Sequence, residues 1–177
     1  MIQFVPIASI PPAEIEHLLD LAFGSDRRGR TAYKLREGTD PIAALSLAAV
    51  EEGVLVGLVL CWPVQLAEAD GRLTPLILVG PVAVRPERQR DGIGRELMLR
   101  MLEAADAAAS DPMTLIGDAS YYERFFGFSA QHTQGWALPG PVERHRLLAR
   151  LRPGQVLPER GALAPRPNVG LDAAVGS

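Results

Sequence analysis

The stretch 89–95, Gln-Arg-Asp-Gly-Ile-Gly-Arg, combines two closely spaced glycines with basic side chains, a combination that can bind an anionic ligand. It follows an apolar run that ends at Val84 and precedes a long amphipathic run. Unpaired backbone N–H groups and the helix dipole make a helix N-terminus attractive to phosphate. Glycines at 92 and 94 would let a phosphate approach the backbone without meeting a Cβ atom. The pattern therefore predicts a phosphate-binding turn between a strand and a helix.

The same glycines also have a purely steric interpretation, in which they only allow a tight strand-to-helix turn. Their spacing matches neither the P-loop nor the dinucleotide-binding pattern, because residue 97 is Leu. A nucleotide-binding protein is therefore the weaker hypothesis, since a Walker lysine and a ribose-binding carboxylate are both missing. Four arginines surround the turn, at positions 85, 88, 90 and 95. They fit either a solvated loop face or a polyanionic ligand.

The segment Gln89–Gly94 resembles the acyl-CoA signature Gln/Arg-x-x-Gly-x-Gly/Ala of the GNAT superfamily of N-acyltransferases. In that family the signature follows a strand ending in a V-x-V-x-P-like segment, which residues 82–86 match. Two later segments resemble a bacterial subgroup of small GNAT enzymes. They are Gly117–Tyr122 with Gly127-Phe128, and the turn Leu138–Pro141.

The resemblance implies an N-acetyltransferase that moves an acetyl group from its co-substrate acetyl-CoA directly to a primary amine. The acceptor would be a small molecule or a polypeptide, with residues 24–41 and the closing strands around it. In the family a backbone N–H of the splayed strand, here that of Val82, polarises the thioester carbonyl, and Val84 bonds the pantetheine arm. The implied cofactor-binding residues are Val82, Val84, Gln89, Arg90, Asp91, Gly92, Ile93, Gly94 and Arg95.

A tyrosine on the small helix after the next strand often protonates the leaving thiolate in this family. Counting from Gly117-Asp118 places Tyr122 at that position, so Tyr122 and the backbone of Val82 are the expected catalytic groups. Counting back from Gly127-Phe128 is one residue out of step, because Phe125-Phe126 replaces a single aromatic residue. Tyr121 is therefore the fallback, and either ring could have a plain packing role.

The general base is not assigned by the resemblance. Some relatives carry a glutamate four residues before the Val82 position, where this chain has Leu78. A water chain to Glu51, Asp118 or His132 could serve instead, as could an amine that arrives neutral. The missing glutamate leaves a second hypothesis open, a non-catalytic module of the same fold that binds or senses acyl-CoA.

Composition limits the remaining classes of function. The chain has 177 residues, a net charge of −3 and no long basic run, so one domain and no nucleic-acid partner are expected. A single cysteine, Cys61, excludes an internal disulfide, and three scattered histidines predict no metal site. We see no signal-peptide pattern and no membrane-spanning apolar run, so a cytoplasmic location is expected. A homodimer is compatible with these features.

Periodicity and turn residues predict an α+β fold, which the resemblance specifies as a splayed, mostly antiparallel central sheet flanked by helices. We expect a GNAT domain over residues 1–157 and a loosely structured tail over residues 158–177. Residues 26–37 fit either a surface helix or a mobile loop. The Gly80-Pro81 pair should break or bulge the sheet. The expected strands cover 1–7, 45–50, 54–64, 73–84, 113–116, 128–138 and 145–151, and the expected helices begin near 12, 92 and 120.

Overall fold

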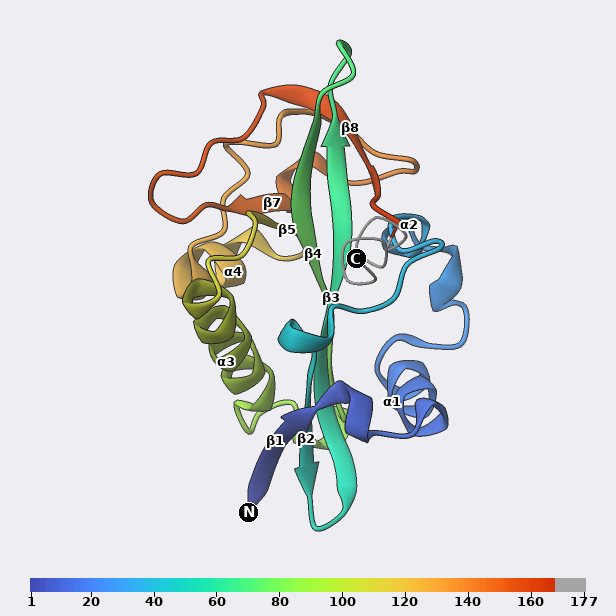
Figure 1. The fold of residues 1–177 in the computed structure, drawn as a ribbon. Helices are drawn as coiled ribbons and strands as arrows, with labels where there is room; N and C mark the ends of the chain where they lie inside the picture. Colours follow the sequence, from blue (N-terminus) through green and yellow to red (C-terminus); the bar gives the residue numbers. More distant parts are fainter. Residues whose placement is uncertain (168–177) are drawn as a thin grey trace, which may run out of the picture. The chain divides into compact units, whose positions relative to one another are not determined.

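A computed structural model describes residues 1–167 of the chain, which divide into two compact units. The first unit contains Met1–Gly29, Pro41–Cys61 and Val79–Ser110, and the second contains Arg30–Asp40, Trp62–Leu78 and the described residues from Asp111 to position 167. The two longest strands, β3 (Val54–Ala67) and β4 (Leu73–Val84), run side by side and contribute to both units (Figure 1).

The described residues form a mixed, mostly antiparallel eight-stranded sheet with hydrogen-bonded order β1-β2-β3-β4-β5-β7, and β8 joins β3 to β6. The pairs β1–β2, β2–β3, β5–β7 and β3–β8 are antiparallel, whereas β4–β5 and β6–β8 are parallel. This arrangement confirms the predicted fold class.

The first unit holds β1 (Ile2–Pro6), α1 (Pro12–Phe23), β2 (Leu47–Glu51) and α3 (Ile93–Ala107). Helix α1 begins with Pro12 in its first turn. Backbone N–H groups of a first turn have no acceptor within the helix, so the missing N–H of proline costs no hydrogen bond there. Helix α3 buries one stripe at helical spacing, formed by Ile93, Leu97, Met98, Met101, Leu102 and Ala105. Burial of this stripe fixes the orientation of the helix within the unit.

Close packing at Gly57 in β3 brings α3 and β4 near the same point of the first unit. A Cβ atom at Gly57 would lie 2.9 Å from Ile93 Cγ2 and 3.2 Å from both Leu97 Cδ1 and the Ala83 carbonyl oxygen. Only a residue without a side chain lets the first turn of α3 approach the strand this closely. The position of the α3 N-terminus therefore depends on residue 57.

Gly57→Ala should lower the free energy of unfolding by about 1–3 kcal/mol, because the added methyl group overpacks a buried contact. Urea denaturation measures the change. Gly29→Ala is the matched control, since a Cβ at Gly29 meets no atom within 4 Å. The control should stay within about 0.5 kcal/mol of the parent protein. Equal losses in the two variants would contradict the packing argument.

Strand β4 carries an extra residue relative to β3. Near the hairpin tip the Glu68 N–H donates to the Arg72 carbonyl at 2.9 Å, and at the far end the Arg85 N–H donates to the Val56 carbonyl at 2.9 Å. In a regular antiparallel ladder the numbers of directly paired residues have a constant sum, and these two sums differ by one. The intervening stretch contains Gly80-Pro81, with φ of 133° at Gly80. The expected irregularity in this strand is thus confirmed.

The second unit holds α2 (Thr31–Lys34), β5 (Met113–Ile116), α4 (Ala119–Phe126), β6 (Gly135–Ala137), β7 (Leu147–Arg150) and β8 (Arg160–Pro165). The Thr31 hydroxyl donates to the Pro141 carbonyl at 2.6 Å and ties α2 to the 138–141 turn. The core cluster of this unit is Leu35, Val64, Leu66, Leu76, Leu78, Trp136, Leu147, Ala149 and Leu163.

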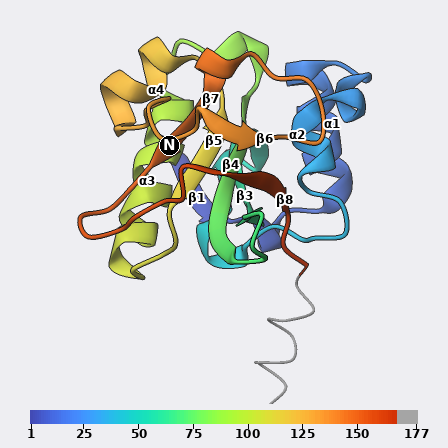
Figure 2. The same cartoon turned by 90° about the horizontal axis from the view of Figure 1, so that it is seen from above.

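The expected loose tail is wrong for residues 160–165, which form strand β8 (Figure 2). This strand pairs antiparallel with residues 64–67 of β3 and parallel with β6. Its small residues show little periodicity, so backbone pairing with a distant strand determines its structure. Leu163, which is 2% exposed, anchors it in the core. The rest of the expected tail, from residue 168, lies outside the described residues.

The two closing strands are shorter than expected. Of the expected strand 128–138 only Gly135–Ala137 is a strand, and of 145–151 only Leu147–Arg150. Thr133 provides the physical reason in the first case, because its N–H at 3.3 Å and its hydroxyl at 3.1 Å both donate to the Ala130 carbonyl and close a turn there. Residues 26–37, whose structure the sequence left open, contain a short 3-10 turn at 27–29 and helix α2.

Candidate functional site

The predicted phosphate-binding turn is the N-terminus of α3 in the first unit. Gly92 is the N-cap residue, in the left-handed conformation with φ of 77°, and no side chain caps the helix there. The N–H groups of the first turn, including those of Ile93 and Gly94, have no acceptor within the helix. A Cβ at Gly92 would meet no atom within 4 Å. The open space and the uncapped amides fit an approaching anion.

Two valines of β4 lie against this helix end. A Cβ at Gly94 would lie 3.4 Å from Val84 Cγ2 and 3.7 Å from Val82 Cγ1, which is ordinary van der Waals contact. Gly94→Ala is therefore compatible with the fold, and the close approach of strand and helix does not by itself require glycine at 94. The structure thus brings Val82, Val84 and the 89–95 turn together in one unit.

The N–H groups of Val82 and Val84 point to the edge of β4 that faces away from β3. Arg85 donates its N–H toward β3, to Val56, and N–H groups alternate between the two edges of a strand. Along that far edge, within the described residues, β5 pairs with β4 only at Ile77 and Leu78. Backbone donors at 82 and 84 are thus directed where a ligand could pair with the strand.

The arginines around the turn have different roles. Arg88 forms ion pairs with Asp91 at 2.5 Å and with Glu51 at 2.6 Å. Arg85 donates from Nε to the Leu55 carbonyl at 2.8 Å. Arg88 and Arg85 therefore hold the loop to the sheet, and the exposed Arg90 and Arg95 are the cations nearest the α3 N-terminus in sequence. Sequence patterns did not separate these two roles.

The three candidate bases differ in their surroundings. A hydrogen bond from Arg88 lowers the pKa of Glu51, and hydrogen bonds from Ser120 lower the pKa of Asp118. Both carboxylates are thus weak proton acceptors at neutral pH. The Nε2 atom of His132 lies 3.2 Å from the side-chain amide nitrogen of Gln131. Of the three side chains, His132 is the one that offers an imidazole nitrogen as a proton acceptor.

Tyr122 lies in the first turn of α4, in the second unit. Asp118 is the N-cap residue, and its carboxylate accepts a hydrogen bond from the Ser120 N–H at 2.9 Å. The Tyr122 N–H in turn donates to the Asp118 carbonyl at 3.0 Å. The cap fixes where the helix begins, which favours the count from Gly117-Asp118 that selected Tyr122.

The ring of Tyr122 is packed among aromatic side chains. Its centroid lies 5.0 Å from that of Tyr121, 6.0 Å from that of Phe126 and 6.3 Å from that of Phe128. Burial raises the pKa of Tyr122 to about 12. The phenol is therefore neutral, and able to donate a proton, over the whole physiological range.

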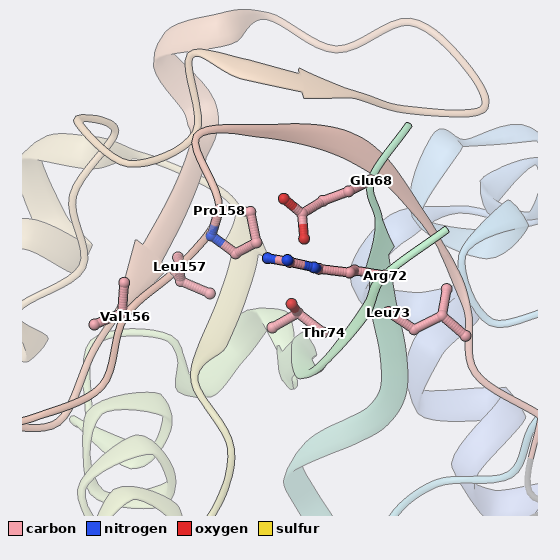
Figure 3. A pocket seen from close by; sticks show the side chains of 7 residues that line it. All are labelled: Glu68, Arg72, Leu73, Thr74, Val156, Leu157 and Pro158. Atoms are coloured by element: carbon pink, nitrogen blue, oxygen red, sulfur yellow. The ribbon is translucent and has the colours of Figure 1, made fainter. Parts of the chain in front are cut away.

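A separate open pocket of about 480 Å³ lies at the β3–β4 hairpin of the second unit. Figure 3 shows the Glu68 carboxylate and the Arg72 guanidinium turned toward each other there, and Val156, Leu157 and Pro158 form another wall. None of the expected site residues lines this pocket. In the described part of the chain there is no cluster of three or more metal-ligating side chains and no helix long and apolar enough to cross a membrane.

Comparison with known proteins places these features in a family context. A sequence model of the acetyltransferase (GNAT) domain matches residues 13–130. The chain is 29% identical over 138 residues to the uncharacterized N-acetyltransferase YhbS of Escherichia coli K12, covering 75% of this chain and 80% of that protein. It is also 29% identical over 137 residues to the uncharacterized N-acetyltransferase YjhQ of the same strain, covering 76% of this chain and 74% of that protein.

Solved structures show the same fold. A GNAT family acetyltransferase from Brucella melitensis, crystallised in complex with acetyl-CoA, is 27% identical with a TM-score of 0.64 and covers 94% of this chain and 96% of that chain. The Escherichia coli YhbS structure, in complex with CoA, has a TM-score of 0.68 at 24% identity and covers 94% of this chain and 89% of that chain.

Proposed function

The chain belongs to the GNAT family of acetyltransferases, and from this premise we propose that it transfers the acetyl group of acetyl-CoA directly to a primary amine. The acceptor is a small molecule or a polypeptide. The observation that carries the proposal is the uncapped N-terminus of α3 beside two outward-facing valine N–H groups of β4. A similar protein from Brucella melitensis was crystallised with acetyl-CoA, which supports this choice of donor.

In the proposed complex the amides within residues 90–95 bind the CoA pyrophosphate, with Arg90 and Arg95 as added cations. The Asp91 N–H is the exception, because it donates to the Arg88 carbonyl at 3.1 Å. The pantetheine arm pairs with the free edge of β4 through the Val84 N–H. The acetyl carbonyl oxygen accepts a hydrogen bond from the Val82 N–H and should lie roughly 3 Å from that nitrogen. This bond strengthens as negative charge develops on the oxygen, so it stabilises the transition state.

The chemical step is attack of the neutral amine nitrogen on the thioester carbonyl carbon. A C–N bond forms, the C–S bond breaks, and the amine loses one proton while the thiolate gains one. Tyr122 is the proposed donor of the proton to sulfur. Because the carboxyl groups of Glu51 and Asp118 have lowered pKa values, we infer that the amine arrives neutral or loses its proton through His132 and water.

A second function is favoured by one observation. Leu78, at the position where some relatives carry a glutamate, is 2% exposed and packed in an apolar core cluster. No carboxylate replaces it on β4, so the fold could serve to bind or sense acyl-CoA without turnover. This alternative shares the cofactor site and lacks only the chemical step.

Two measurements test the proposed function. Isothermal titration calorimetry should detect acetyl-CoA binding, and the absence of heat at millimolar acetyl-CoA would overturn both functions. A screen of amine acceptors that follows free thiol release should find turnover that depends on both acetyl-CoA and an amine. Binding without thiol release, across small amines and peptides with free N-termini or lysines, would favour the sensing module.

A further inference from the structure

Gly117, the residue between β5 and α4, lies directly against the ring of Tyr122. A Cβ atom at Gly117 would lie 2.6 Å from Tyr122 Cε2, 2.9 Å from Tyr122 Cδ2 and 3.2 Å from Leu115 Cδ1. Separations below 3.0 Å are not tolerated, so a methyl group and the present ring position exclude each other. The backbone of Gly117 does not have a positive φ, so its conformation alone would accept alanine.

The backbone at Gly117 is held in place by its neighbours. Its N–H donates to the Arg146 carbonyl at 2.9 Å, and the preceding residue, Ile116, pairs with Leu147 in the β5–β7 ladder. Asp118, the following residue, caps α4. An added methyl group therefore cannot be relieved by moving this segment without breaking a strand pair or a helix cap.

The ring is the part that can move. The plane of Phe128, which is fully buried, lies at 72° to that of Tyr122 with the centroids 6.3 Å apart, and Tyr121 stands edge-on at 5.0 Å. Rotation of the ring away from residue 117 disturbs these contacts and relocates the hydroxyl at its tip. Contact with residue 117 thus determines where the hydroxyl of Tyr122 lies.

We propose that Gly117 is a positioning residue for Tyr122: the missing side chain leaves the volume that the ring occupies, and so fixes the position of the hydroxyl that is the proposed proton donor. This inference rests on the proposed function for its catalytic consequence, whereas the ring placement stands on the packing alone. Acting only through Tyr122, Gly117 should influence turnover and leave binding of acetyl-CoA unchanged.

Gly117→Ala should lower kcat on the order of 10²-fold, the loss typical of a displaced catalytic group, with the KM for acetyl-CoA little changed. The decisive comparison adds the same change to Tyr122→Phe. Phenylalanine keeps the two clashing ring carbons and lacks the hydroxyl. In the Tyr122→Phe background, Gly117→Ala should therefore lower the melting temperature by as much as it does in the parent, but it should lower kcat no further. An equal loss of kcat in both backgrounds would overturn the positioning role and indicate general destabilisation.

A spectroscopic readout separates failure of this inference from failure of the proposed function. The pKa of Tyr122 can be followed by ultraviolet titration of tyrosinate, with Tyr122→Phe used to assign the Tyr122 transition. This pKa should be about 12 in the parent and should move toward the ordinary tyrosine value in Gly117→Ala. If the pKa of Tyr122 shifts in Gly117→Ala but kcat is unchanged in Tyr122→Phe, the packing role of Gly117 stands and Tyr122 is rejected as the proton donor. An unmoved titration would overturn the inference.

Folding of the variants is controlled within the same set. Tyr122→Ala removes the ring, so alanine at 117 should lower the melting temperature less in that background than in the parent. This coupling can be measured even if Gly117→Ala alone does not fold. Gly29→Ala, which adds a methyl group in open space, should leave the melting temperature unchanged. Equal destabilisation by Gly117→Ala with and without the Tyr122 ring would contradict the proposed contact.

Discussion

Tyr122→Phe should lower kcat by roughly 10²–10⁴-fold, the range for loss of a positioned proton donor, while the Kd for acetyl-CoA stays the same. The phenylalanine ring preserves the contacts with Tyr121, Phe126 and Phe128, so the melting temperature should change little. Stopped-flow detection of thiol release at saturating acetyl-CoA measures the step. The expected loss comes from the missing hydroxyl, because the thiolate must then leave unprotonated or draw a proton from water.

Tyr121→Phe is the matched control, since Tyr121 is adjacent on the same helix and is the alternative proton donor. It should retain kcat. A large loss of kcat in Tyr121→Phe with none in Tyr122→Phe would show that Tyr121 is the proton donor. No loss of kcat in either variant would indicate that water protonates the thiolate.

The pH dependence has a defined sign. Burial raises the pKa of Tyr122 to about 12, so its ionisation should not reduce kcat below pH ~10. The folded state binds this proton more tightly than the unfolded state. The associated stability is therefore complete below pH ~10 and is lost as pH rises toward 12.

Gly92→Asn should raise the Kd for acetyl-CoA by about 10²-fold. A charge-assisted hydrogen bond contributes about 1.5–3 kcal/mol, and every 1.4 kcal/mol is a factor of ten in affinity. An asparagine side chain would occupy the open space beside the uncapped amides of α3 and obstruct the pyrophosphate. Asparagine tolerates positive φ better than other non-glycine residues, so the helix N-terminus should remain formed.

Gly53→Asn is a closely matched control for this variant. Gly53 has φ of 79°, against 77° at Gly92, and at both positions a Cβ meets no atom within 4 Å. Gly53 lies in the β2–β3 turn, so its variant should carry the same backbone strain and bind acetyl-CoA normally by calorimetry. Equal weakening in the two variants would favour the steric interpretation of the Gly92 turn.

The strand-turn-helix segment around the expected cofactor site could be predicted because its determinants are local. Pro81 lacks an N–H and Gly80 accepts a positive φ, so a bulge in β4 follows from two adjacent residues. Gly92 begins α3 through its own backbone conformation and needs no distant partner. The same holds for the Asp118 cap, which places Tyr122 in the first turn of α4.

The packing of separate elements against one another decides the remaining features, which no local pattern carries. Arg88 is paired with Glu51, 37 positions away, and this pairing makes it a structural cation rather than a free one for phosphate. Strand β8 has too few apolar residues to show a period, and it forms because β3 and β6 offer it backbone partners. The contact of Gly117 with the Tyr122 ring depends on how β5, β7 and α4 pack together, since a glycine has no side chain whose pattern could reveal which volume it must leave empty.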